Sequence, residues 1–167
     1  MAETFFTSDT HFNHYNIIKY CNRPFGSVEE MTTVLTENWN KVVSPNDVVW
    51  HLGDFAFGPV GMCNGLLHQL NGTKYLIRGN HDANEKRMLA VGFKEVHKRF
   101  QWNEWWLVHR PRSAPEGARV LCGHVHNHWA RIGWFINVGV DVQEFTPRTI
   151  DELLTTPEAD PSMQVDM

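Results

Sequence analysis

Short apolar runs of strand length alternate along the chain with segments whose apolar residues recur at the helical period. The runs that look like strands lie at residues 4–8, 47–52, 74–77, 93–100, 105–108, 119–121 and 134–138. The clearest helical segment starts at Ser27, where Ser27 and Glu30 have the spacing of a capping box. Shorter helical segments run through Leu70, from Glu85 to Val91 and near residues 149–154. This alternation predicts an α/β domain rather than an all-α or all-β one.

The length of the chain fits one domain. It has 167 residues, of which 42% are hydrophobic, enough to bury a core within the usual span of roughly 100–200 residues per domain. No repeat or linker divides the sequence, so we predict a single domain over residues 1–155. Residues 156–167 are polar and acidic and contain two prolines, and we expect a flexible tail there.

The charge, cysteines and hydropathy narrow the functional class. A formal net charge of −4 argues against non-specific nucleic-acid binding driven by a basic surface. Cys21, Cys63 and Cys122 are far apart and form no C-x-x-C pair, so we expect free, mostly buried thiols. The N-terminus lacks the pattern of a secretory signal, and no run approaches a membrane span. We therefore expect a cytoplasmic protein without membrane contacts, and the sequence leaves the oligomeric state open.

Polar residues that can bind metals or transfer protons directly follow five of the apolar runs. The groups are Asp9-Thr10-His11, Gly53-Asp54, Gly79-Asn80-His81-Asp82, His109, and Gly123-His124-Val125-His126. In α/β sheets the ligand crevice lies outside the carboxyl ends of the strands. We therefore expect the five groups to converge on one site.

The spacing and the residue types indicate a metal site. Asp9 and His11 are two residues apart, as are His124 and His126, and in extended backbone such pairs point to the same side. Carboxylate, imidazole and amide ligands without thiolate suit Zn, Mn, Fe or a similar divalent ion. Seven such groups are too many for one tetrahedral ion, and they fit two ions that share a carboxylate.

The ordered set of motifs D-x-H, G-D, G-N-H-D, H and G-H-x-H resembles the signature of the calcineurin-like metallophosphoesterases. More narrowly, it is similar to the short single-domain phosphoesterases of bacteria and their phages. The resemblance extends over residues 4–141. It implies a four-layer α-β-β-α sandwich of two mixed sheets flanked by helices, with the metals at one edge.

The resemblance also assigns roles to individual residues. It implies one metal held by Asp9, His11 and His126, and a second held by Asn80, His109 and His124. Asp54 would bridge the two ions, for which manganese is favoured over iron, zinc or similar metals. His81 would act as the general acid, and Asp82 would orient the His81 ring.

Several residues near the motifs are candidates for contact with substrate. Four arginines offer the forked geometry that suits phosphate, namely Arg23, Arg78, Arg110 and Arg112. Among these we take Arg23 and Arg78, together with His14, as the substrate-binding candidates. Trp129 follows the last histidine motif and is the tryptophan expected nearest to substrate.

The function implied is hydrolysis of phosphodiesters or small phosphorylated metabolites, by attack of a hydroxide that bridges the two ions. The partner expected is accordingly a small phosphoester. A metal-dependent nuclease is the alternative enzyme, and the acidic charge balance argues mildly against it. A catalytically inactive interaction scaffold of the same fold is a third reading, and the intact set of ligands argues against it.

Overall fold

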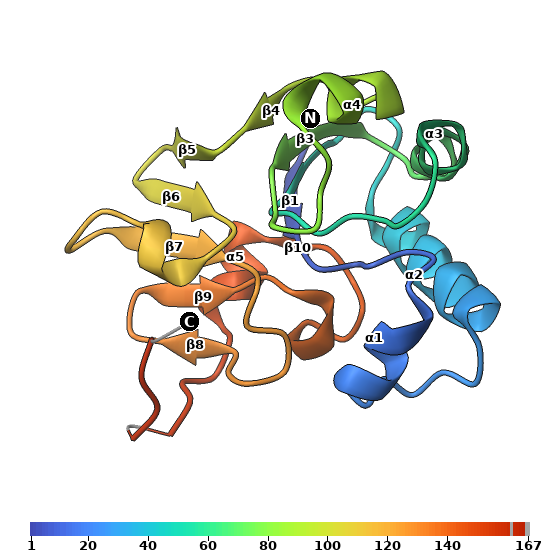
Figure 1. Cartoon of the computed structure of the whole chain (residues 1–167). Coiled ribbons are helices and arrows are strands. Elements are labelled where there is room, and N and C mark those ends of the chain that lie inside the picture. Colours follow the sequence, from blue (N-terminus) through green and yellow to red (C-terminus); the bar gives the residue numbers. More distant parts are fainter. Residues whose placement is uncertain (161, 166–167) are drawn as a thin grey trace.

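The first of two β-sheets is built from the N-terminal half of the chain and one late strand (Figure 1). The computed structural model describes residues 1–160 and 162–165. The sheet has the order β10-β1-β2-β3-β4. Its strands are β1 (Thr4–Thr7), β2 (Val48–His51), β3 (Thr73–Ile77), β4 (Val96–His97) and β10 (Arg148–Thr149). Neighbours are parallel except for β10, which runs antiparallel to β1. The carboxyl ends of β1, β2 and β3 therefore meet at one edge.

The second sheet has the order β5-β6-β7-β9-β8. Its strands are β5 (Arg99–Trp102), β6 (Trp105–Val108), β7 (Arg119–Cys122), β8 (Arg131–Ile132) and β9 (Phe135–Asn137). The strands β6, β7 and β9 are parallel, whereas β5 and β8 are antiparallel to their neighbours. Both sheets are thus mixed, and the predicted α/β class is confirmed.

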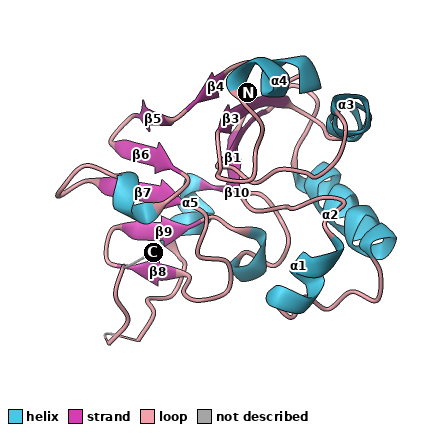
Figure 2. Ribbon diagram, in the orientation of Figure 1, coloured by secondary structure: helices cyan, strands magenta, loops and turns pink. Residues whose placement is uncertain are grey.

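Among the described residues, four helices pack with the first sheet, α1 (Tyr15–Tyr20), α2 (Val28–Val42), α3 (Val60–Gln69) and α4 (Glu85–Val91) (Figure 2). The short helix α5 (Ile150–Leu154) contributes Leu153 to the core between the sheets, and the 3-10 turns are η1 (Pro111–Ser113) and η2 (Val140–Val142). The α2 helix starts as predicted, because the Ser27 side chain accepts a hydrogen bond from the Glu30 amide. No helix in the described part of the chain is long and apolar enough to cross a membrane.

The apolar residues of the first sheet alternate between two cores. Phe5, Val49 and Leu76 pack with the helices. Their chain neighbours Phe6, Trp50 and Ile77 face the second sheet instead, where they pack with residues such as Leu107, Leu121 and Ile136. Adjacent residues on a strand point to opposite faces, so strands that are covered on both faces read as continuous apolar runs.

The chain passes from one sheet to the other at Lys98. The sequence predicts one strand over residues 93–100, but the structure divides this segment between β4 and β5. Ile77 pairs with His97 in the first sheet, and Arg99 pairs with Val108 in the second. A local apolar pattern does not reveal such a change of partner, because both halves remain extended.

The predicted boundary at residue 155 and the predicted flexibility of the tail stay predictions. Within the tail, the Ala159 amide donates to the Arg131 carbonyl at 2.7 Å. Ala159 and Val165 also pack against a third core cluster, on the outer face of the second sheet. Residues 161, 166 and 167 of this tail lie outside the described residues.

Candidate metal centre

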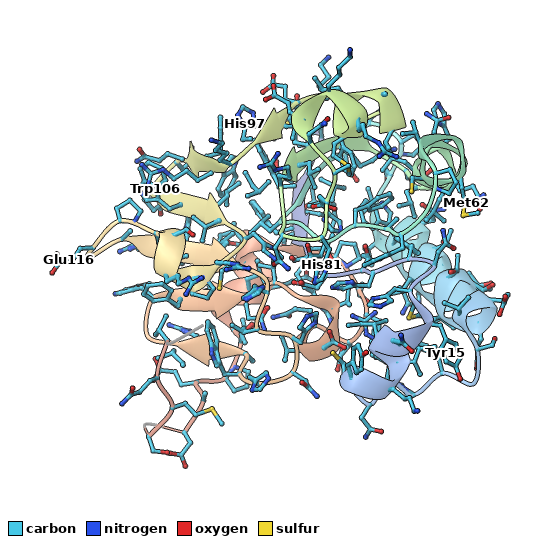
Figure 3. All side chains as sticks on the ribbon, in the orientation of Figure 1. Tyr15, Met62, His81, His97, Trp106 and Glu116 are labelled. Carbon is cyan, nitrogen blue, oxygen red and sulfur yellow. The ribbon has the colours of Figure 1, made fainter. Side chains whose placement is uncertain are left out.

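The five polar groups that follow the apolar runs meet at the carboxyl ends of β1, β2, β3, β6 and β7. Figure 3 labels His81 at this place, near the middle of the view. A backbone hydrogen bond joins loops within each sheet, from the Asp9 amide to the Gly53 carbonyl at 2.9 Å and from the Gly123 amide to the His109 carbonyl at 3.0 Å. The His124 amide, which follows a strand of the second sheet, donates to Asp9 Oδ2 at 2.9 Å. The edges of both sheets therefore contribute side chains to one site.

Asp9, His11 and His126 form the first group of metal-ligating side chains. One ligand atom of each lies within 4.8 Å of those of the other two. The Nε2 atoms of His11 and His126 are 3.9 Å and 4.0 Å from Asp9 Oδ1. These distances exceed those of hydrogen bonds and leave room for an ion between the atoms.

Asp54, His109 and His124 form the second group, again with ligand atoms within 4.8 Å of one another. Asn80 adjoins this group, because its Oδ1 atom lies 3.0 Å from His109 Nε2. Asp54 Oδ2 is 3.4 Å from His109 Nε2 and 3.5 Å from His11 Nε2. This carboxylate thus stands between the two groups, where a shared ligand would be needed.

Three buried polar atoms point into this space without a hydrogen-bond partner in the described part of the chain, namely Asp9 Oδ1, Asp54 Oδ2 and His11 Nε2. The other oxygen of each carboxylate is engaged. Asp9 Oδ2 accepts from Ser8 Oγ at 2.6 Å and from the His124 amide at 2.9 Å. Asp54 Oδ1 accepts from the His81 amide at 2.9 Å. Buried unpaired carboxylate oxygens are unfavourable, and divalent cations would satisfy them, so these residues fit such ions.

Hydrogen bonds on the far side of two imidazoles direct their Nε2 atoms inward. His109 Nδ1 donates to the Leu52 carbonyl at 2.7 Å. His126 Nδ1 lies 3.3 Å from Asp141 Oδ2. Arg23 holds Asp141 with two bonds of 2.8 Å and 2.9 Å. Partners of this kind fix the tautomer and orientation of a metal-binding histidine.

The predicted reason for the paired ligands is wrong, although the pairs do face one site. The spacing argument assumes extended backbone, yet five of the seven predicted ligands have positive φ angles, between 46° and 72°: Asp9, His11, Asp54, His124 and His126. Residues other than glycine seldom adopt this conformation, and such strain is concentrated at functional sites. Gly79 adds a further constraint, because a Cβ atom there would overlap the Asp54 carboxylate.

The charges of the cluster shift the pKa values of its members strongly. Burial lowers the pKa of His109, but the nearby carboxylates of Asp54 and Asp9 outweigh burial and raise it to about 9. Burial also lowers the pKa of His126, and contact with Asp141 reverses this and raises it to about 10. His11 shows the opposite result, because burial lowers its pKa to about 2. Metal binding at His109 and His126 would therefore compete with protonation of these two imidazoles.

His81 lies at the exposed side of the cluster. Its ring centroid is 5.6 Å from that of His11 and 5.7 Å from that of Phe57. Its ring makes no hydrogen bond within the described residues, which leaves it free to approach a ligand. The ring's role as general acid remains a prediction.

The predicted contact between Asp82 and the His81 ring is wrong. The Asp82 carboxylate instead accepts hydrogen bonds from the amides of Asp54 at 2.8 Å, Phe55 at 2.9 Å and Gly79 at 2.8 Å. The three amides lie in the loops that follow β2 and β3. Two of them donate to Oδ2 of Asp82, and the Phe55 amide donates to Oδ1. Asp82 therefore positions the loop that carries Asp54.

Two residues expected to contact substrate are buried in the structure. Arg23 has 4% of its surface exposed, and besides Asp141 it donates to the carbonyls of Asp9 and Thr10. Its prediction as a phosphate ligand is wrong, because these bonds occupy its guanidinium group. Trp129 is also buried, with 4% exposed, and packs in the outer core of the second sheet.

His14 and Arg78 remain near the site. The His14 ring stacks on Phe57 with 4.2 Å between centroids, and its Nδ1 atom is 3.4 Å from His11 Nδ1. Arg78 lines a cavity of about 220 Å³ together with Asn80 and His109. Their contact with substrate is a prediction that this geometry permits.

Asp141 and Lys98 are the residues near the site that sequence reasoning missed. Asp141 follows the apolar run at residues 134–138, so the same argument from strand ends had a signal for it. Lys98 carried no signal, because its position depends on the change of sheet at that residue.

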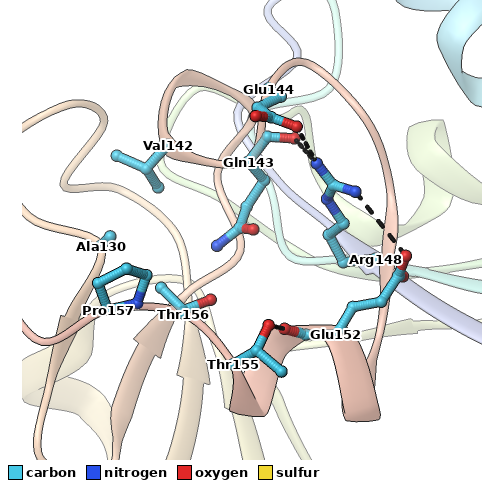
Figure 4. A pocket seen from close by; sticks show the side chains of 9 residues that line it. All are labelled: Ala130, Val142, Gln143, Glu144, Arg148, Glu152, Thr155, Thr156 and Pro157. Atoms are coloured by element: carbon cyan, nitrogen blue, oxygen red, sulfur yellow. Dashed lines mark hydrogen bonds and ion pairs between the residues drawn. The ribbon is translucent and has the colours of Figure 1, made fainter.

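A second cavity, of about 420 Å³, lies elsewhere in the molecule (Figure 4). Gln143, Thr155 and Pro157 line it, with the ion pairs of Arg148 to Glu144 at 2.7 Å and to Glu152 at 3.8 Å. It contains none of the predicted site residues, and its cation is already paired. We assign no ligand to it.

Comparison with known proteins gives consistent matches over nearly the whole chain. A family model described as calcineurin-like phosphoesterase matches residues 3–158. An uncharacterized protein of Methanocaldococcus jannaschii is 38% identical over 165 residues, which cover 90% of this chain and 89% of that protein. The gene 66 protein of Mycobacterium phage L5 is 39% identical over 135 residues, which cover 77% of this chain and 60% of that protein. A solved structure of a protein of unknown function from Aquifex aeolicus has a TM-score of 0.70 and 29% identity, covering 92% of this chain and 98% of that one.

Proposed function

The chain belongs to the family of calcineurin-like phosphoesterases, metal-dependent hydrolases of phosphate esters, and we propose that it hydrolyses phosphodiesters or small phosphorylated metabolites at a dinuclear site. The observation that carries the proposal is the unpaired Asp54 Oδ2 atom, which is 3.5 Å from His11 Nε2 in one ligand group and 3.4 Å from His109 Nε2 in the other. A buried carboxylate oxygen with an imidazole nitrogen on each side suits a ligand shared by two cations.

The two ligand groups divide the binding of the metals. One ion would be held by Asp9, His11 and His126, the other by Asn80, His109 and His124, and Asp54 would be shared by both. We favour manganese among the divalent ions that suit oxygen and imidazole ligands. When bound, two such ions supply an activated water as nucleophile and neutralise charge on the phosphoryl oxygens.

His81 supplies the proton for the departing ester oxygen. Its amide is fixed on Asp54 Oδ1 at 2.9 Å, so the backbone that carries the ring is tied to the shared carboxylate. Its ring is exposed and without a hydrogen bond among the described residues, so one nitrogen can face the leaving group. General acid catalysis of this kind contributes about 10²–10⁴-fold in rate.

The proposal is tested by metal analysis and hydrolysis of bis(p-nitrophenyl) phosphate with added manganese. Asp54→Asn is expected to lose both ions and turnover, because it withdraws charge from both groups. His81→Ala should keep its metal and slow turnover by about 10²–10⁴-fold. Asp151→Asn, an exposed carboxylate on α5, is the control and should match the wild type.

Two results would contradict the proposal. Full metal occupancy with unimpaired hydrolysis in Asp54→Asn would remove its role as shared ligand. Absence of turnover under several metals would favour an interaction scaffold. Hydrolysis is then measured with cyclic nucleotides, dinucleotides, phosphomonoesters and single-stranded DNA to define the substrate class. Cleavage of single-stranded DNA and of none of the other substrates would indicate a nuclease.

A further inference from the structure

A cavity lined by cationic side chains opens beside the second ligand group. It has a volume of about 220 Å³, and its lining includes Arg78, Lys98 and Arg110. Asn80 and His109, two of the proposed metal ligands, also line it. The cavity therefore adjoins the metal centre directly.

The register of both sheets brings the three cations together. The Arg78 amide donates to the His97 carbonyl at 2.8 Å, which places Arg78 against the residue that precedes Lys98. On the other side of Lys98, Arg99 pairs with Val108, two residues before Arg110. Segments of the chain that are distant in sequence thus deliver three positive charges to one edge.

These charges are not neutralised by carboxylates in the part of the chain that the structure describes. No ion pair joins Arg78, Lys98 or Arg110 to an acidic residue there. Glu85 lines neighbouring hollows together with Arg78, but no contact of ion-pair length joins the two. Gathered like charges repel one another unless an anion lies between them.

We propose that this cavity binds a second phosphate group of the substrate, next to the phosphate that is hydrolysed. The inference rests on the proposed function and narrows it to small molecules with linked phosphates, such as nucleoside diphosphate derivatives. Two guanidinium forks and an ammonium group suit phosphate oxygens. In the reaction, water adds to the scissile phosphorus and the ester oxygen leaves with a proton. The second phosphate is bound and remains intact.

A small molecule fits better than a nucleic acid. The three cations line one cavity of limited volume, and the whole chain has a net charge of −4. Binding of long polyanions depends on many phosphate contacts along a basic surface. A single cavity provides only one such contact point beside the metals.

The test compares two ligands that differ by one phosphate group, α,β-methylene adenosine diphosphate and adenosine monophosphate. Their dissociation constants are measured by calorimetry on the manganese-loaded protein, and their inhibition constants by initial rates with bis(p-nitrophenyl) phosphate. The wild type should bind the diphosphate about tenfold more tightly, the effect of about one charged hydrogen bond. In the double variant Lys98→Ala/Arg110→Ala this ratio should fall close to one.

Arg112→Ala is the matched control, because Arg112 is exposed, belongs to the same 3-10 turn region and does not line the cavity. It should retain the tenfold ratio, and all three proteins should unfold at similar temperatures. An unchanged ratio in the double variant would overturn the inference, as would a wild type without preference. If a ten-thymidine oligonucleotide binds the wild type more tightly than the diphosphate does and loses this binding in the double variant, that result would overturn the inference in favour of a nucleic-acid substrate.

The calorimetric measurement does not depend on turnover, so it tests the inference independently of the proposed function. If no phosphate ester is hydrolysed under several metals, the proposed function fails, and the ratio of the two dissociation constants still tests the cavity. If hydrolysis occurs and the ratio is one, only the inference fails.

Discussion

Replacing Asp82 should destabilise the fold and disturb the metal centre through the backbone. Its carboxylate accepts three hydrogen bonds, from the amides of Asp54, Phe55 and Gly79 at 2.8–2.9 Å. Hydrogen bonds to charged groups contribute about 1.5–3 kcal/mol each. Burial raises the pKa of Asp82, and the accepted hydrogen bonds offset part of that effect. Removing the charge therefore recovers some free energy, and the lower end of the range applies.

We expect Asp82→Ala to lower the free energy of unfolding by about 4.5 kcal/mol, from three lost hydrogen bonds of about 1.5 kcal/mol each. Asp82→Asn keeps one oxygen, which can still accept from Asp54 and Gly79, while its amide group faces the Phe55 donor. We expect Asp82→Asn to lower the free energy of unfolding by about 2 kcal/mol. Urea denaturation of the metal-free protein measures both values, since ligand binding would otherwise add to stability.

A double-mutant cycle with His81→Ala separates this role from orientation of the His81 ring. Asp82 does not contact that ring, so the effects of Asp82→Asn and His81→Ala on kcat should add on a logarithmic scale. An Asp82→Asn variant with unchanged stability, whose kinetic defect disappears in the His81→Ala background, would refute the reasoning.

Three further predictions follow from contacts around the ligands. Asp141→Asn should weaken metal affinity at the group that contains His126 by about 10–100-fold, because it loosens the imidazole, and metal titration that showed wild-type affinity would contradict this. Gly79→Ala should reduce metal content and stability, since its Cβ atom would overlap the Asp54 carboxylate; normal metal content in the purified variant would argue against the close approach. Gly65 lies inside α3, and an added Cβ atom would meet nothing within 4 Å beyond its chain neighbours and the backbone of its own helix. Gly65→Ala should therefore raise the free energy of unfolding by about 0.5–1 kcal/mol, and a lower thermal unfolding temperature would contradict this.

The α/β class and the main strands were predictable, because strands covered on both faces leave continuous apolar runs. The run predicted at residues 47–52 contains β2, Val48–His51, and the helix predicted from Ser27 is α2, Val28–Val42. Strands of two residues, such as β8 and β10, carry too little periodicity to be recognised. Their pairing is decided by tertiary contacts.

Convergence of the candidate ligands was also predictable, since it depends on the direction of parallel strands. Two details were not. The left-handed backbone of Asp9 and His11 is uncommon for residues other than glycine, and the apolar pattern of the sequence does not indicate it. The burial of Arg23 depends on Asp141, a partner 118 residues away, which no local pattern indicates.

The two sheets contribute different chemistry to the candidate centre. Every predicted oxygen ligand, on Asp9, Asp54 and Asn80, follows a strand of the first sheet, whereas three of the four predicted imidazoles follow strands of the second. Neither half of the molecule alone has a complete coordination set. High-affinity metal binding should therefore arise only once the sheets have docked, so that metal uptake during refolding would report the last stage of assembly.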